Sequence, residues 1–200
     1  MRDLGIADRL RAAGIRVVEV AGWQTAGSDS FGWNGGGPGG SVNHHTAGPS
    51  SGSTPSLLTC IEGRPDLPGP LCHVMQSREP SVDIAYVIAS GRSNHAGEGG
   101  WMGLSGNASV YGLEIEHDGV SALPQRRIET AAAIHAAMFQ GNPGMVCQHA
   151  EWAKPAGRKI DAATNVPGDW FRELVADAAS GVKPPPPPED RTPFLAYAYP

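Results

Sequence analysis

Short segments rich in β-forming residues alternate with segments of helical periodicity along this chain of 200 residues. The predicted strands are residues 16–21, 41–46, 71–76, 84–89, 110–117 and 145–149. The predicted helices are residues 2–13, 54–62, 124–140 and 169–179. Strands and helices that alternate in this way form a layered domain of the α/β or α+β class. The sequence therefore predicts one folded domain over residues 1–182.

Glycine and proline divide these segments sharply. The chain has 27 glycines and 18 prolines, so it is rich in loops. Gly14 and Gly63 directly follow predicted helices, where a left-handed residue ends a helix, and Thr54-Pro55 is typical of a helix start. A proline run at 184–188 cannot join a sheet or a helix. We therefore expect residues 183–200 to be a linker and tail, or the start of a second module.

Charge and hydropathy exclude several classes of function. The net charge is −5 and no basic cluster exceeds three residues, so we expect no binding of nucleic acid. No apolar run approaches the roughly 20 residues of a membrane span, so we expect no membrane partner. Charges interrupt the first 14 residues, which is not the pattern of a signal peptide, and we expect synthesis in a cytosol. The odd number of cysteines favours free thiols, although a Cys60–Cys72 bridge stays open.

Polar residues at predicted strand ends suggest a metal site. His44 and His149 lie at or near the ends of two strands, and Asp161 lies in the loop after the second. Catalytic zinc sites commonly take three ligands of the histidine and carboxylate type and leave a fourth position open. The chain has no HExxH helix and no CxxC pair, and a hydrogen-bonded or surface histidine is the commoner outcome for any one of its seven histidines.

Four short segments, taken together, indicate the function more specifically than any one of them does alone. They are VNHHTAG at 42–48, NHAG at 94–97, GLEIE at 112–116, and His149 followed by GRKID at 157–161. In this order they resemble the zinc-dependent N-acetylmuramoyl-L-alanine amidases of the type-2 amidase and peptidoglycan recognition protein family. The pattern is similar to the amidase domains of lysins from phages of actinobacteria, in which a proline-rich linker leads to a wall-binding module.

The resemblance implies a role for each matching residue. One Zn²⁺ would be held by His44, His149 and Asp161. Glu114 would be the general base and Lys159 would stabilise the oxyanion. The substrate groove would be lined by His95, Asn94 and His45, of which His45 is otherwise a packing residue.

The resemblance also implies a fold, a substrate and a setting. The fold would be a single α/β domain with a central mixed β-sheet flanked by helices and a zinc cleft at one edge of the sheet. The substrate would be bacterial peptidoglycan, cut between N-acetylmuramic acid and L-alanine by a monomeric enzyme. A phage lysin of this kind is made in the host cytoplasm and acts on the cell wall after release. The tail at 183–200 would then be the start of a wall-binding module.

The chemistry of these residue types agrees with the roles. Zinc lowers the pKa of a bound water to about 7, and a nearby carboxylate can move its proton to the leaving amine. Glu114 and Glu116 share one strand face, so the second glutamate stays a rival or a supporting residue. Lys159 and Asp161 are likewise two apart in an extended loop. Lys154 is a rival to Lys159 that lacks the aspartate two residues later.

Three departures from the family pattern and two alternative functions stay open. Asn43 and Asn94 replace an aliphatic residue and a tryptophan, and residues 150–156 are an insertion. One alternative is a peptidoglycan-binding module without catalysis, although all three candidate ligands are present. The other is a thiol hydrolase that uses Cys72 or Cys147 with a histidine, although neither cysteine lies in a nucleophile turn.

Overall fold

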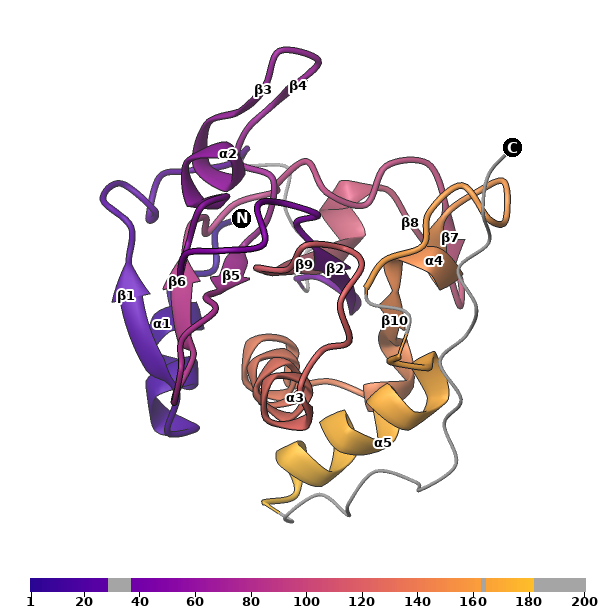
Figure 1. Cartoon of the computed structure of the whole chain (residues 1–200). Helices are drawn as coiled ribbons and strands as arrows, with labels where there is room; N and C mark the ends of the chain where they lie inside the picture. The colour runs from indigo at the N-terminus through magenta and orange to yellow at the C-terminus, as the bar shows by residue number, and fades with distance from the viewer. Residues whose placement is uncertain (29–36, 163–164, 182–200) are drawn as a thin grey trace.

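A mixed β-sheet forms the centre of the molecule (Figure 1). The structure is a computed structural model that describes residues 1–28, 37–162 and 165–181. The six strands of the sheet follow the order β1-β6-β5-β9-β2-β10 in this part of the chain. Their bounds are Arg16–Glu19 for β1, Gly40–His45 for β2, Val74–Gln76 for β5, Ile84–Val87 for β6, Val110–Ile115 for β9 and Val146–Gln148 for β10. Only β5 and β6 run antiparallel among these neighbours.

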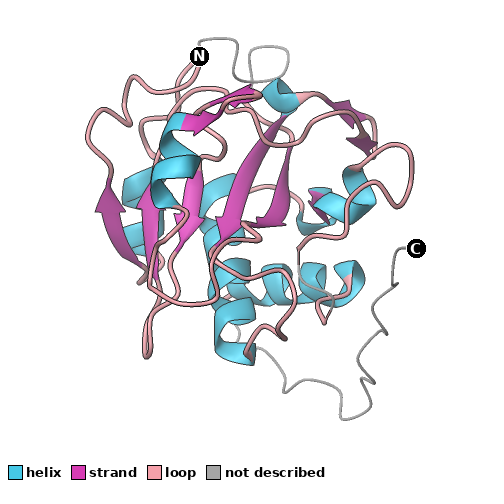
Figure 2. Ribbon diagram, turned by 45° about the horizontal axis from the view of Figure 1, so that its top comes forward, coloured by secondary structure: helices cyan, strands magenta, loops and turns pink. Residues whose placement is uncertain are grey.

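Three helices cover one face of the sheet. They are α1 (Ile6–Ala12), α3 (Gln125–Phe139) and α5 (Gly168–Ala179), and α3 lies against both of the others (Figures 1 and 2). Ile128 and Ile134 of α3 are buried with Phe171 and Leu174 of α5 in the largest apolar cluster. Burial of such side chains stabilises the fold by about 1.5–3 kcal/mol each. The core therefore lies between α3, α5 and this face of the sheet.

The opposite face of the sheet carries shorter elements. These are α2 (Leu57–Glu62), α4 (His149–Trp152) and two hairpins, β3–β4 (Gly63–Arg64 and Leu67–Pro68) and β7–β8 (Gly100–Trp101 and Leu104–Ser105). Two smaller apolar clusters hold α2, α4 and the β7–β8 hairpin in place, one around Cys60 and Met75 and one around Val42 and Trp152. Space remains between these covering segments, and the candidate site lies there.

The predicted α/β fold with a central mixed sheet flanked by helices is confirmed. Gly14 and Gly63 do follow helices, with φ angles of 77° and 92°. The start predicted for α2 at Thr54-Pro55 is wrong, because the helix begins at Leu57 and Ser56 precedes it. The backbone N–H of Ser56 donates to the carboxylate of Glu116, a tertiary contact that no local pattern reports.

The structure also bears on the cysteines, the tail and membrane-spanning helices. The three cysteines are free and buried, so no Cys60–Cys72 bridge forms. The linker and tail predicted at 183–200 lie outside the described residues. Among the residues that are described, no helix combines the length and the apolar character needed to cross a bilayer.

Candidate metal centre and active-site cleft

Strand register brings the candidate residues to one end of the sheet. His44 of β2 lies beside Glu114 of β9 in a parallel pair, so their side chains share the face opposite α3. On the other side of β2, Gln148 of β10 pairs with Asn43, and His149 follows directly. The predicted strand position of His149 is wrong, because β10 ends at Gln148 and His149 begins α4. This turn directs the His149 side chain back toward His44.

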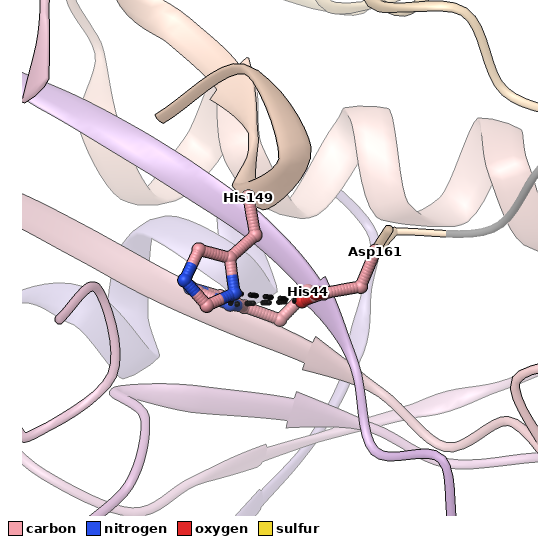
Figure 3. Close-up of side chains that lie close together, drawn as sticks. All are labelled: His44, His149 and Asp161. Atoms are coloured by element: carbon pink, nitrogen blue, oxygen red, sulfur yellow. Dashed lines mark hydrogen bonds and ion pairs between the residues drawn. The ribbon is translucent and has the colours of Figure 1, made fainter. Parts of the chain in front are cut away.

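His44, His149 and Asp161 converge on one point (Figure 3). The Nδ1 atoms of the two histidines lie 2.9 Å apart. The Asp161 Oδ2 atom lies 2.8 Å from Nδ1 of His149 and 3.4 Å from Nδ1 of His44. The backbone N–H of Ala150 donates to the carbonyl of Asp161, which ties this loop to the start of α4. Among the described residues this is the group of three ligand-type side chains close enough to hold one metal ion.

The protonation of the three side chains leaves acceptors facing one another. Nε2 of His149 lies 3.1 Å from the carbonyl of Ala96, which only accepts hydrogen bonds, so this nitrogen carries the proton. Nδ1 is therefore the ring nitrogen of His149 that can present a lone pair to the cluster. Burial lowers the pKa of His44 to about 4, so this imidazole is neutral at pH 7.

Asp161 adds a negative charge to these lone pairs. Burial raises the pKa of Asp161, but its contacts with His149 and His44 lower the pKa by more, because a proton or another cation held between ring and carboxylate favours the ionised form. Two imidazoles and one carboxylate at such distances repel one another unless a cation lies between them. Histidine nitrogens with one carboxylate oxygen are ligands that suit a divalent ion such as Zn²⁺. The donor set therefore fits a metal ion.

A cleft of about 540 Å³ opens beside the three side chains. Each of the other residues predicted for the site lines it: His45, Asn94, His95, Glu114 and Lys159. The rival Lys154 is exposed and is not among the lining residues. Other parts of the wall have no signal in the sequence, and they include Arg64, Leu67, Asp118, Val120, Arg158 and Ile160. Arg64 and Leu67 belong to the β3–β4 hairpin, whose two-residue strands give no periodic signal.

Comparison with known protein families identifies the family to which a chain with this site belongs. The sequence matches the N-acetylmuramoyl-L-alanine amidase family, Amidase_2, over residues 34–169. The chain belongs to this family. Its members hydrolyse an amide bond in peptidoglycan. A comparison with curated proteins finds no match.

Solved structures of other amidases share the fold of this amidase at low sequence identity. A selenomethionine derivative of AmpD is 20% identical with a TM-score of 0.54, covering 80% of this chain and 94% of AmpD. The endolysin LysCS from Clostridium intestinale URNW is 21% identical with a TM-score of 0.50, covering 84% and 97%. AmiD from E. coli, solved with anhydro-N-acetylmuramic acid-L-Ala-D-gamma-Glu-L-Lys, is 19% identical with a TM-score of 0.52, covering 80% of this chain and 60% of AmiD.

Glu114, in β9, and Glu116, just beyond the end of β9, have different surroundings in this amidase. Glu114 lines the cleft, and its buried Oε2 has no hydrogen-bond partner among the described residues. Burial raises the pKa of Glu114 well above its usual value. Glu116 lies just beyond β9 and accepts hydrogen bonds from Thr46 and Ser56. Glu116 therefore holds the start of α2, and Glu114 is the carboxylate that faces the cleft.

The two asparagines that depart from the family pattern make specific contacts. Asn43 points to the α3 face, where its side chain bonds with Gln148 and His135 in a buried polar network. Asn94 donates from its side chain to the carbonyl of Pro68, which ties the 94–97 segment to the β3–β4 hairpin. Neither substitution removes a group from the candidate metal centre.

The cysteines offer no alternative nucleophile. Cys72 and Cys147 are buried, and neither is among the residues that line the cleft. Burial raises the pKa of both thiols, which disfavours the reactive thiolate. Cys147 packs with Val42, Ala96 and Trp152 as a small apolar side chain.

Proposed function

We propose that this chain is a zinc-dependent lysin that cuts peptidoglycan between the lactyl group of N-acetylmuramic acid and the first L-alanine of the stem peptide. The observation that carries the proposal is the convergence of His44, His149 and Asp161 with their acceptor atoms turned toward one another. These three side chains would hold one Zn²⁺. When bound, zinc polarises the scissile carbonyl and lowers the pKa of water at the site.

Glu114 and Lys159 supply the rest of the proposed chemistry. The Glu114 carboxylate takes a proton from the attacking water and passes it to the amine of L-alanine as the C–N bond breaks. Lys159 places a positive charge where the carbonyl oxygen becomes negative. The products are the free lactyl carboxylate and a stem peptide with a new amino terminus. Support for these roles comes from the position of both residues on the cleft wall beside Asp161.

The setting of the enzyme is part of the same proposal. The motif pattern resembles phage lysins, and the endolysin LysCS shares the fold. We propose a monomeric enzyme that is made in the cytoplasm of an infected host and then degrades the cell wall.

Digestion of purified cell wall tests the activity directly. We expect free amino-terminal alanine to appear without new reducing sugar ends, and we expect a chelator to stop the reaction and zinc to restore it. Thiol reagents leave a metal hydrolase active and inhibit a thiol hydrolase. Wall binding by the zinc-loaded chain without release of alanine would instead identify a binding module and overturn the proposal.

Two variants separate metal binding from proton transfer. Asp161→Ala removes a ligand, so zinc content and activity fall together. Glu114→Ala keeps the zinc and lowers kcat by about 10²–10⁴-fold, the usual size of a general acid–base effect. A Glu114→Ala enzyme that cuts the wall as fast as the parent contradicts the general-base role.

A further inference from the structure

The outer nitrogen of His44 is held by a second histidine. Nε2 of His44 lies 3.0 Å from Nδ1 of His95, and Nε2 of His95 lies 3.2 Å from the carbonyl of Val110. The carbonyl oxygen only accepts, so Nε2 of His95 carries the proton of that ring. Nδ1 of a neutral His95 is then an acceptor, and the proton in its contact with His44 belongs to Nε2 of His44.

We propose that His95 is a positioning residue that fixes the tautomer of His44 and so presents the lone pair of its Nδ1 to the metal. The chain of contacts runs from the Val110 carbonyl through His95 to His44. This inference rests on the proposed function, because it concerns the same zinc site. It gives His95 a role beyond contact with substrate.

The surroundings of His95 are built to keep its ring in this place. Gly112 of β9 lies under the ring, and a Cβ atom there would come within 2.6 Å of Cγ and Nδ1 of His95. The Asn107 side chain accepts hydrogen bonds from the backbone N–H groups of His95 and Ala96, at 3.2 and 2.8 Å. The lack of a side chain at Gly112 and the hydrogen bonds to Asn107 therefore both fix the position of the His95 imidazole.

One short segment supports both histidine ligands. Ala96 directly follows His95, and its carbonyl accepts from Nε2 of His149. His95 and Ala96 thus hold the outer nitrogens of His44 and His149, so each ring directs its Nδ1 atom toward the other and toward Asp161. Partners of this kind raise metal affinity by orienting the ligand, and their loss typically costs 10–100-fold in affinity or activity.

Zinc affinity measured by competition with a chelator tests the role. His95→Phe keeps a ring of similar shape and removes the acceptor, so we expect the dissociation constant for zinc to rise about 10–100-fold. His95→Asn places a carbonyl oxygen near the position of Nδ1, so we expect its affinity to return to within a few-fold of the parent. His117→Phe is the matched control, for which we expect the parent affinity, because His117 is a buried histidine that is not among the residues lining the cleft and whose Nδ1 accepts from the backbone of Gly119.

The outcomes separate this inference from the proposed function. Failure of the parent chain to bind zinc overturns both. Zinc binding by the parent with equal affinity in His95→Phe overturns the role of His95 alone. Thermal unfolding in chelator checks that the metal-free variants fold. Nitrogen-15 spectra of the zinc-loaded parent need no variant: we expect protons on Nε2 of His44 and of His95, and a proton on Nδ1 of His95 contradicts the inference.

Discussion

Two lysines of the loop after α4 allow the effect of a positive charge inside the cleft to be compared with the effect of one outside it. Lys159 lines the cleft two residues before Asp161, and its charge acts on both His44 and Glu114. Lys154 is exposed outside the cleft. We expect Lys159→Met to lower kcat about 10²–10³-fold with zinc content unchanged, because the variant loses a positive charge where the carbonyl oxygen becomes negative. Release of alanine from purified wall measures the rate.

Lys154→Met is the matched control for this prediction. It removes the same charge from the same loop, and we expect the parent rate. Equal rates for the two variants would show that the ammonium of Lys159 does not act on the reacting carbonyl.

The sequence predicts which residues gather at the site better than it predicts what each one contacts. His44, His149 and Asp161 were expected in one cleft, and the structure brings them together. Glu116 could not be distinguished from Glu114, because a period of two puts both on one face and gives no sign that the strand ends at Ile115. The contact between His95 and His44 joins residues 51 positions apart and leaves no local pattern.

Elements were predictable where a local signal sets them. Gly14 and Gly63 end helices because each takes a positive φ angle that other residues avoid. The start of α2 depends on the Glu116 side chain, which arrives from elsewhere in the fold. The helical turn at His149 instead has a local signal, which lies in two residues three positions apart. The start of α4 is capped by a reciprocal pair of hydrogen bonds between Gln148 and Glu151.

The N-terminal segment is fastened to the sheet by one carboxylate. Asp3 accepts from Arg9, which itself bonds the last turn of α3, and from the Tyr111 hydroxyl of β9 at 2.5 Å. Burial raises the pKa of Asp3, but these partners lower it by more, so its pKa is below the usual 3.8. A folded-state pKa below the unfolded value stabilises the protein above that unfolded value. The stabilisation is lost as the pH falls through the folded pKa.

Asp3→Asn tests this contribution by urea unfolding at several pH values. We expect the free energy of unfolding to fall by about 1.5–3 kcal/mol at pH 7, as for hydrogen bonds to a charged group. The difference from the parent should shrink as the pH falls below about 4. Asp8→Asn is the control, because the Asp8 side chain is 84% exposed and forms an exposed ion pair with Arg11. A difference that does not change with pH would contradict the ionic origin.

At the scale of the whole molecule, the sequence indicated the layers but not the order of the strands. β2 lies between β9 and β10, and both of these strands are far from β2 along the chain. Only this order places His149 next to His44. Two of the candidate ligands, His44 and His149, are 105 residues apart, and the third, Asp161, follows 12 residues later. The candidate metal site therefore forms only after the sheet, α4 and the 161 loop have assembled.

Zinc should consequently stabilise the fold as a whole. A ligand that binds only the native state at 100 times its dissociation constant adds about 2.7 kcal/mol, which for a domain of this size raises Tm by about 5–10 °C. We expect this rise when zinc is added to the metal-free parent and none in His149→Ala, which lacks one of the three ligands. Differential scanning calorimetry in matched buffers measures it. An equal rise in both proteins would mean that zinc binds elsewhere, since a site assembled from β2, α4 and the 161 loop cannot keep its affinity without His149.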